Sequence, residues 1–597
     1  MLAELTVEAS LEPVLDRLRN DDVLGQLLER RGRAAELATE AGDVKLAWAG
    51  GLAWLLDHPE ALATIEGVAA DLRRSGIRHL VWAGMGGSVQ TVHALAGLGF
   101  FENAGVMVHP LDSTDPAALN RLLREIDDGG GLSSSLRHTA MVGVSMGMTS
   151  EEPITHLEWF DGLLKACDVP DRAAHVTVMT LEGSLLDQFA RARGSRQLSI
   201  QPDGESHTPG RMSAPATHVF LLPAALALSQ GDLGGALERC QAELRLRSGL
   251  PAGERSRLIA EDPFVRLAAW LHLQIAEGRD MVLLDMEEQD RALAPWVEQV
   301  VEESLGKEGR GLLVFHQQDL SAAALWPDRF SVLRVGRGSG PAPQGRPVAQ
   351  LTLGPWAGAA ERLAVVARFF AGWNLTVALL GYLEGITFAG QPAVEGYKRY
   401  ARELRDRAGD LPYPGGDLVT STSGKLELSL DALSGAGVDE ARIRSRAAGW
   451  GGGPAAVLAA TAATLRDDGR LGYLDVTLNA DPDGALWAGV GSGARDLAYR
   501  GLQRPVKVRS GPRDYHSTEQ SETDGPPDLL SVRLLVRETE DIAAGSYSNR
   551  FLHAQALGTV AAMRDARRPV LLGLLSGAGD VRDVDELFGQ AARLLSG

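Results

Sequence analysis

The stretch IRHLVWAGMGGSVQTVHALAGL (residues 77–98) decides the fold class. Residues 77–84 are a short apolar run typical of a buried strand, and residues 89–98 have the apolar spacing of a helix. A glycine-rich turn, Gly84-Met85-Gly86-Gly87-Ser88, joins the two. A strand that passes directly into a helix is half of a β–α–β unit, which predicts a parallel sheet covered by helices.

The same alternation continues along the chain. Apolar, strand-like runs in the first half lie at 77–84, 105–111, 138–144 and 173–179. A helix is expected at 217–231, and the pattern then restarts with strands at 279–286, 310–316, 329–336 and 347–354. The two series predict an α/β protein with two tandem lobes, each a parallel sheet flanked by helices.

The two ends of the chain differ from this pattern. Residues 1–75 are expected to be helical, with Thr6 as a candidate cap of the first helix. Residues 360–386 predict two packed helices, broken at Gly372 and Asn374, rather than a membrane span. From about residue 411 the sequence predicts a smaller α+β module. The expected organisation is an N-terminal helical segment (1–75), two lobes (76–260 and 261–410) and a C-terminal module (411–597).

Composition narrows the class of protein. A chain of 597 residues needs two or three cores, and its formal net charge of −19 disfavours nucleic acid and anionic membranes as partners. Its two cysteines, Cys167 and Cys240, form no CxxC metal motif, which fits a reducing cytosol. The charged N-terminus has no signal-peptide core. The sequence therefore predicts a cytoplasmic protein, and a pocket for an anion would have to supply its own positive potential.

The glycine turn at 84–88 is a candidate anion site. Glycines let a ligand approach the backbone, and the helix that follows offers unpaired N–H groups to a phosphate. The alternative is a tight turn without a ligand. A dinucleotide site is disfavoured because Val89 stands where G-x-G-x-x-G requires its third glycine.

A run of hydroxyls follows the strand expected at 138–144. Ser145, Thr149 and Ser150 stand before a helix, where such side chains either hold a phosphate or cap the helix. Residues 143–147, GVSMG, also match the G-x-S-x-G nucleophile elbow of α/β-hydrolases. A serine hydrolase with Ser145 as its nucleophile is therefore an alternative.

Two more motifs place charged groups beside predicted helices. Arg211 precedes the apolar helix expected at 217–231. Glu302 and Glu303 end another helix, where two carboxylates oppose the helix dipole. A departure of this kind from local preference is typical of a functional site, although a surface arginine and a solvated helix end are the ordinary interpretations.

Six segments, taken in order, resemble the phosphoglucose isomerase family. They are GMGGS (84–88), LDSTDP (111–116), PGRMSAPATHVFLLPAAL (209–226), WVEQVVEESLGKEGRG (296–311), FAGQPAVEGYK (388–398) and PRDYHSTEQSETDGPP (512–527). The chain is most similar to the isomerase half of bacterial transaldolase/phosphoglucose isomerase fusions. The resemblance implies two sugar-isomerase (SIS) lobes and an aldose–ketose isomerase of glucose 6-phosphate, active in glycolysis and gluconeogenesis without a metal or cofactor.

The resemblance also implies roles for single residues. Glu303 matches the base that moves a proton between C1 and C2, and Arg211 matches the group that stabilises the enediolate. Lys398 and His516 match the groups that act at the ring oxygen. The positions that hold the substrate phosphate are Gly86, Gly87, Ser88, Ser145, Thr149 and Ser150. Subunit contacts near the site in this family are compatible with a homodimer.

The chain departs from the family in its phosphate loop, S-K-S/T-G-x-T-x-E-T. Met146 stands at the lysine position, Gly147 at the next hydroxyl and Pro153 at the last one. The family segment HSTGQLHKGG has become HSTEQSETDG, which gains carboxylates that a phosphosugar would tolerate poorly: Glu519, Glu522 and Asp524. A SIS-fold protein that acts on or binds a different sugar is therefore the second hypothesis.

Overall fold

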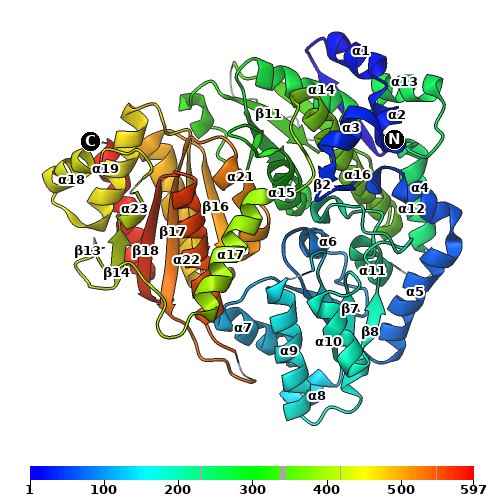
Figure 1. The fold of residues 1–597 in the computed structure, drawn as a ribbon, viewed down its shortest axis with the longest axis horizontal. Coiled ribbons are helices and arrows are strands. Elements are labelled where there is room, and N and C mark those ends of the chain that lie inside the picture. The colour runs from blue at the N-terminus through cyan, green and yellow to red at the C-terminus, as the bar shows by residue number, and fades with distance from the viewer. Residues whose placement is uncertain are drawn as a thin grey trace.

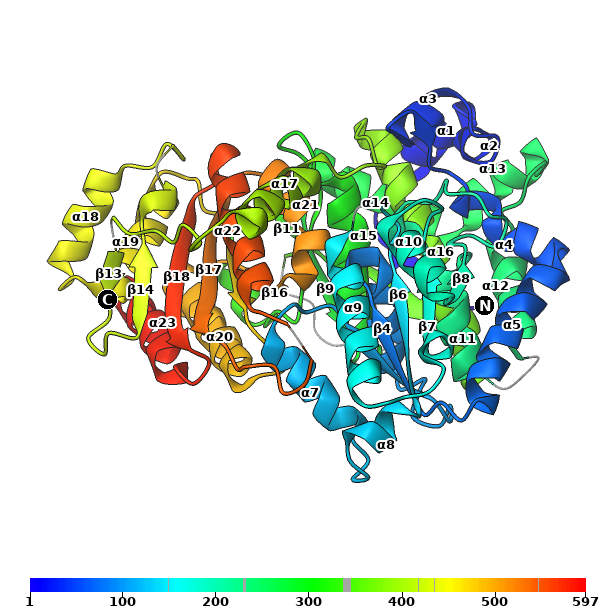
Figure 2. The same cartoon turned by 60° about the horizontal axis from the view of Figure 1, so that its bottom comes forward.

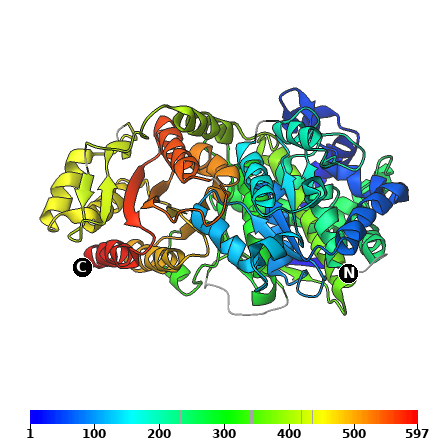
Figure 3. The same ribbon diagram turned by 90° about the horizontal axis from the view of Figure 1, so that it is seen from below.

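The structure is a computed structural model that describes residues 1–148, 150–228, 232–336, 345–416, 418–433, 435–545 and 547–596. These residues form three large sheets with helices on their faces (Figures 1 and 2). Residue 1 lies toward one end of the longest dimension, and residues 581–596 lie toward the other (Figure 3). The predicted α/β class with parallel sheets flanked by helices is confirmed.

The first lobe contains an entirely parallel sheet in the order β5-β4-β6-β7-β8. Its strands are β4 (His79–Ala83), β5 (Met107–Leu111), β6 (Thr139–Val144), β7 (Val176–Met179) and β8 (Arg196–Leu198), of which the first four are the predicted ones. Its helices are α4 (Trp48–Asp57), α5 (Pro59–Arg74), α6 (Gln90–Gly97), α7 (Pro116–Ile126), α8 (Leu132–Leu136), α9 (Glu151–Ala166), α10 (Leu185–Arg193) and α11 (His218–Ala227).

The second lobe contains a five-stranded sheet in the order β1-β12-β11-β9-β10. Its strands are β1 (Ala3–Val7), β9 (Met281–Met286), β10 (Leu313–His316), β11 (Phe330–Val335) and β12 (Val348–Leu353), and the last four are the predicted ones. The helices around it are α1 (Glu12–Asn20), α2 (Val23–Leu28), α3 (Gly32–Leu37), α12 (Asp232–Leu244), α13 (Ala252–Glu261), α14 (Pro263–Ala276), α15 (Ala294–Leu305) and α16 (Ala359–Glu384).

The start of the chain corrects the prediction for the N-terminal segment. Strand β1 pairs antiparallel with β12, so Thr6 lies in a strand and does not cap a helix. Ala3 and Leu5 are buried while Glu4 and Thr6 are exposed, which is the alternation of a strand with one covered face. This edge position is available only because the chain returns with β12, more than three hundred residues later.

The apolar stretch at 360–386 is a single helix, α16, and not the two helices that Gly372 and Asn374 predict. Asn374 is buried and donates to the carbonyl oxygens of Met212 and Ala214. Among the described residues α16 is long and apolar enough to cross a membrane, yet its apolar window is 100% buried within the protein. It is therefore a core helix, packed against α12 and α14.

Gly372 makes close packing possible in this core. A Cβ added there would lie 2.3 Å from the fully buried ring of Phe264. Gly372→Ala is therefore expected to destabilise the protein by about 1–3 kcal/mol, although alanine is the better helix former. Urea unfolding measures the effect. The matched control is Gly396→Ala in α17 (Pro392–Asp406), where a Cβ meets nothing within 4 Å and no loss is expected; a similar result for both variants would contradict the prediction.

The C-terminal module contains a six-stranded sheet in the order β13-β14-β18-β17-β15-β16. Four strands run parallel, and the antiparallel pairing is confined to the β13–β14 edge. The strands are β13 (Leu418–Thr420), β14 (Leu426–Ser429), β15 (Tyr473–Asn479), β16 (Val506–Gly511), β17 (Leu529–Glu538) and β18 (Val570–Gly577). The helices are α18 (Glu440–Gly449), α19 (Gly453–Asp467), α20 (Ala485–Asp496), α21 (Glu519–Asp524), α22 (Arg550–Asp565) and α23 (Val581–Ser596).

One hydrophobic cluster joins this module to the second lobe. It contains Met281 and Leu283 of β9 and Phe315 of β10, packed with Tyr473 and Leu529 of the module. Because the module is fixed to the second lobe, the segment between β16 and β17 is held over the first lobe, where His516 carbonyl oxygen meets Gly86.

Candidate active site

Residues that are far apart in the sequence line one cavity of about 220 Å³. The cavity lies where the turn after β4, the segments after β6, β7 and β8, the end of α15, the start of α17 and the 513–516 turn converge. The sequence-predicted residues among its lining are Gly87, Ser88, Ser145, Ser150, Arg211, Glu303, Lys398 and His516. Gly86 is not among the lining residues, and Thr149 lies outside the described residues.

The two carboxylates at the end of α15 diverge. Glu302 accepts from the amide of Val314 at 2.7 Å and pairs with Lys507, away from the cavity. Glu303 lines the cavity, where its Oε1 lies 3.2 Å from Arg211 Nη1 and its Oε2 accepts from Gln299 at 2.8 Å. Burial raises the pKa of Glu303, and the charge of Arg211 and the hydrogen bond from Gln299 oppose that rise.

Arg211 is fixed by the groups around it. Its Nε donates to the hydroxyl of Ser304 at 2.6 Å, and its Nη2 donates to the carbonyl oxygens of Phe388 at 2.7 Å and Gly390 at 3.2 Å. Its side chain is 3% exposed. All three guanidinium nitrogens thus make hydrogen bonds, which hold the planar cation against Glu303.

His516 and Lys398 reach the cavity from the C-terminal module and α17. The Nε2 atom of His516 lies 2.7 Å from Glu152 Oε1 and 2.6 Å from Tyr397 Oη. Burial raises the pKa of Glu152, but the charge and hydrogen bond of His516 outweigh it and lower that pKa to about 2. Lys398 Nζ pairs with Glu395 at 2.8 Å. Glu152 is thus an ionised carboxylate, and it orients the imidazole ring of His516 through their hydrogen bond.

The glycine turn brings three chain segments into contact. A Cβ on Gly86, whose φ is 54°, would lie 2.3 Å from the His516 carbonyl oxygen. A Cβ on Gly87 would lie 2.3 Å from the carbonyl carbon of Gly210. Only glycine therefore allows this turn to pack against both the 209–211 and the 513–516 segments.

The hydroxyl loop after β6 is closed by its own hydrogen bonds. Ser145 Oγ donates to Ser150 Oγ at 2.7 Å and accepts from the amide of Gly147 at 3.1 Å. Ser150 occupies the N-cap position of α9 but makes no side-chain cap hydrogen bond. The start of α9 is thus not capped by Ser150, and the partners of the Ser145 hydroxyl are loop atoms rather than a histidine.

The carboxylates gained in the HSTEQSETDG segment do not line the cavity, so the expected repulsion of a phosphosugar by them is wrong. Glu519 and Glu522 are buried in α21 and pair with Arg533 Nη2 at 2.9 and 2.6 Å. Asp524 accepts from Gln520 at 3.2 Å. Glu519 and Glu522 thus face Arg533 of β17 in the C-terminal sheet.

Three neighbours of the predicted residues were not singled out from the sequence. Gln299 lies one helical turn before Glu303 on α15, a spacing that could have indicated contact. Tyr397 precedes Lys398 directly. Glu152 stands at the glutamate of the loop pattern S-K-S/T-G-x-T-x-E-T, which could have indicated it, but only the fold shows that it meets His516.

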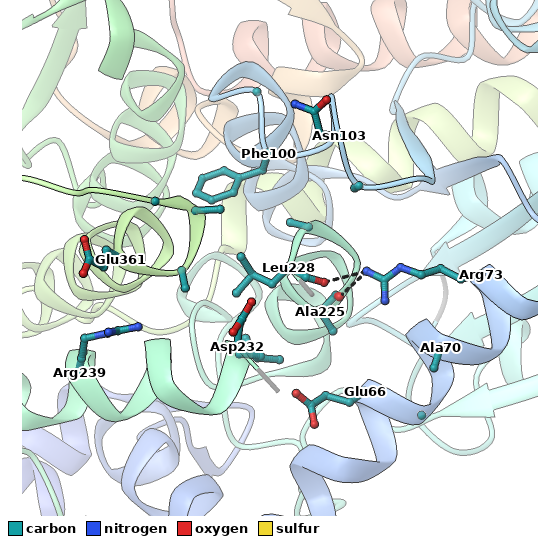
Figure 4. A pocket seen from close by; sticks show the side chains of 18 of the residues that line it. Glu66, Ala70, Arg73, Phe100, Asn103, Ala225, Leu228, Asp232, Arg239 and Glu361 are labelled. Atoms are coloured by element: carbon teal, nitrogen blue, oxygen red, sulfur yellow. Dashed lines mark hydrogen bonds between the residues drawn. The ribbon is translucent and has the colours of Figure 1, made fainter. Parts of the chain in front are cut away.

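A larger cavity, of about 1170 Å³, lies elsewhere, between α5, α12 and the start of α16 (Figure 4). Figure 4 shows Arg73 reaching across it to the end of α11, where it donates to the carbonyl oxygens of Ala225 and Leu228. No sequence-predicted site residue is among its described lining residues. The described residues also contain no group of three or more His, Cys, Asp and Glu that could hold a metal ion.

Comparisons with known proteins give partial sequence matches. No family model matches the chain. A glucose-6-phosphate isomerase from Citrifermentans bemidjiense is 31% identical over 208 residues, 33% of this chain and 34% of that protein. One from Synechococcus sp. is 31% identical over 234 residues, 38% of this chain and 40% of that protein. The chain thus spans less than half the length of either relative.

Solved structures share the fold. A hypothetical protein from Thermus thermophilus has a TM-score of 0.53 at 22% identity, over 68% of this chain and 100% of that one. A glucose-6-phosphate isomerase from Chlamydia trachomatis has a TM-score of 0.52 at 15% identity, over 68% of this chain and 88% of that one. The sequence matches show similarity to glucose-6-phosphate isomerases over 33–38% of the chain, and the solved structures show that its α/β fold is shared.

Proposed function

We propose that this chain is a glucose-6-phosphate isomerase, which interconverts glucose 6-phosphate and fructose 6-phosphate through ring opening and an enediolate. The observation that carries the proposal is that Glu303, Arg211, Lys398 and His516, from four separate elements, line one cavity. The sequence matches to relatives named glucose-6-phosphate isomerase support the same activity.

Ring opening requires a proton to reach the ring oxygen while another leaves the anomeric hydroxyl. Imidazole exchanges protons near neutral pH, and His516 is held for this task by Glu152 and Tyr397. Lys398 adds a second donor to the same cavity. The two side chains can therefore act together on the ring oxygen.

Isomerisation moves one proton between neighbouring carbons. The carboxylate of Glu303 takes the proton from C2, the electron pair forms the C1–C2 double bond, and the C1 carbonyl oxygen becomes the oxyanion of the enediolate. Return of the proton to C1, with transfer of the C2 hydroxyl proton to the C1 oxygen, gives the ketose. Arg211 already lies beside Glu303, so its charge meets the developing oxyanion without rearrangement. Ser88, Ser145 and Ser150 are the hydroxyls of the cavity that would receive the phosphate.

The proposal is tested by assaying purified protein with fructose 6-phosphate, coupled to a glucose-6-phosphate dehydrogenase that reports product. Saturable turnover that disappears on heating the protein supports it. A well-folded preparation with no turnover at millimolar fructose 6-phosphate would remove it.

Gln299→Met is expected to move the acidic limb of the pH profile of kcat/KM to higher pH. The amide of Gln299 stabilises the charged form of Glu303, so its loss raises the pKa of Glu303 further. The base is then protonated, and inactive, up to a higher pH. The matched control is Gln289→Met, since Gln289 is exposed and bonds Glu287 away from the cavity. Superimposable profiles for wild type and Gln299→Met would contradict the assignment of Glu303 as the base.

The second candidate is a SIS-fold protein that binds or converts a different sugar. Met146 and Pro153 line the cavity where the family pattern has a lysine and a hydroxyl, which favours a less anionic ligand. Thermal-shift screening separates the two functions, because stabilisation by free sugars and not by hexose 6-phosphates would favour this candidate. A Ser145 hydrolase is disfavoured by the loop hydrogen bonds of its hydroxyl, and labelling of Ser145 by a fluorophosphonate would revive it.

A further inference from the structure

A short hairpin near the N-terminus brings one more cation to the cavity. β2 (Thr39–Glu40) and β3 (Asp43–Val44) pair antiparallel, and Lys45 follows the hairpin directly. Lys45 lines the same cavity as Glu303 and Ser145. It belongs to none of the motifs that predict the site, and its segment lies before the first strand of the lobe.

Lys45 is fixed on one wall of the cavity. Its Nζ donates to the carbonyl oxygen of Ser206 at 3.1 Å, and the amide of Ala47 donates to the carbonyl oxygen of His207 at 3.0 Å. The side chain is 15% exposed. Its ammonium group is thus held beside residues 206–208, of which Ser206 and Thr208 also line the cavity.

The order of strands places this wall relative to the hydroxyl loop. The loop at 145–150 follows β6, Leu181 follows β7 and residues 206–208 follow β8, and these strands are neighbours in that order. The Gly86 turn that meets His516 follows β4, on the other side of β6. Lys45 therefore approaches the loop from the side opposite His516.

The other charged residue of the hairpin faces a different wall. A Cβ on Gly390 would lie 3.7 Å from Glu40 Oε1, so Glu40 lies beside the segment whose carbonyl oxygens hold Arg211. Glu40 and Lys45 thus line the cavity from two directions.

Lys45 carries the least neutralised charge of the lysines and arginines that line the cavity. Arg211 lies 3.2 Å from Glu303, and Lys398 lies 2.8 Å from Glu395. The carboxylate nearest Lys45 is Asp43, at 3.6 Å, and Asp43 is 57% exposed to water. An ion pair at this distance, with one partner exposed to water, neutralises little of the charge of Lys45.

The hydroxyl loop needs such a charge. Met146 and Gly147 supply neither a cation nor a hydroxyl, and Ser145 and Ser150 bond to each other. A phosphate dianion is bound strongly only where charge-assisted hydrogen bonds replace its water. We propose that Lys45 binds the substrate phosphate in place of a lysine on the loop and makes the protein selective for phosphorylated sugars. This inference rests on the proposed function for the identity of the site.

Isothermal titration of wild type and Lys45→Gln with fructose 6-phosphate, inorganic phosphate and free fructose tests the proposal. Glutamine keeps a donor for the Ser206 carbonyl oxygen and removes the charge. The Kd for fructose 6-phosphate and for inorganic phosphate is expected to rise about 10- to 100-fold, the loss of one charge-assisted hydrogen bond, while binding of free fructose is unchanged. Lys45→Arg is expected to restore phosphate affinity, and KM is expected to rise with little change in kcat.

The matched control is Lys165→Met, at the exposed far end of α9, which alters net charge without altering the cavity. Equal affinities of wild type and Lys45→Gln for fructose 6-phosphate would overturn the inference, and so would an equal loss of affinity for free fructose, which indicates displaced packing. Wild-type protein that binds fructose 6-phosphate without converting it defeats the proposed function alone, because the titration reads binding. If the wild-type protein binds neither fructose 6-phosphate nor inorganic phosphate, both the proposed function and the role of Lys45 are wrong.

Discussion

Glu303→Gln is expected to lower kcat for the interconversion of glucose 6-phosphate and fructose 6-phosphate by about 10²- to 10⁴-fold, the usual contribution of a general base. The amide keeps the shape of the side chain and its place beside Arg211, but it cannot accept the proton from C2. Fructose 6-phosphate should still bind, since the residues proposed to hold its phosphate are other residues of the cavity. The coupled assay measures kcat, and calorimetric titration measures binding.

The matched control for this variant is Glu308→Gln, in the turn that follows α15. Glu308 pairs with Arg310, its side chain is 79% exposed, and it does not line the cavity. Its kcat should equal that of wild type. Turnover by Glu303→Gln within a few-fold of wild type would show that another group is the base and would require a different reaction for the cavity.

Arg533→Met is expected to lower the free energy of unfolding by about 3–5 kcal/mol, because it leaves buried carboxylates without their cation. Arg533 is 0% exposed and lies between Glu519 and Glu522, which are each 1% exposed. Its Nε also donates to the hydroxyl of Ser531 at 3.1 Å. Urea unfolding followed by circular dichroism measures the loss.

The loss of stability in Arg533→Met should depend on pH. Burial raises the pKa of Glu519, and the nearby charge of Arg533 opposes that rise. Without Arg533 the folded-state pKa rises further above its unfolded value, so stability falls as pH rises through the folded pKa. The difference between variant and wild type should therefore be larger at about pH 8 than at about pH 6.

The control is Arg582→Ala, which removes an 88% exposed arginine and its surface pair with Glu586. Such a pair contributes at most about 1 kcal/mol, so stability should be nearly unchanged. If Arg533→Met costs no more than Arg582→Ala, the buried pairs between α21 and the C-terminal sheet do not hold the module together. The position of His516, which precedes α21, would then need another explanation.

The local pattern of apolar residues predicted helices and strands correctly where tertiary packing favoured the same structure. The strands at 77–84 and 138–144 form as expected because each is a short apolar run that ends in glycine or serine. Pattern failed at Gly372, since an isolated glycine weakens a helix by only about 1 kcal/mol and burial of α16 outweighs that cost. The prediction of a helix cap at Thr6 failed because this segment forms a strand only through pairing with β12, which lies far away in the sequence.

The residues of the candidate site were also predicted only in part from the sequence. Glu303, Arg211, Lys398 and His516 were predicted from the family resemblance, and the structure brings them to one cavity. The motifs did not predict that Glu519 points away from that cavity. The direction of a side chain on α21 depends on which face of the helix packs on the sheet. The pairing of Glu152 with His516 was missed because the two residues lie far apart in the sequence and only the fold brings them together.

The sequence by itself determined the alternation of strands and helices, the glycine turn at 84–88 and the chemistry of the four candidate catalytic residues. These are local properties, because the period of apolar residues and the freedom of glycine act within a few residues. Only the tertiary structure decided which charges meet at the cavity. Lys45 reaches it because the 39–44 hairpin lies beside the segment after β8, and Glu519 leaves it because Arg533 lies behind α21. Such pairings depend on strand order and long-range packing, which no short stretch of sequence encodes.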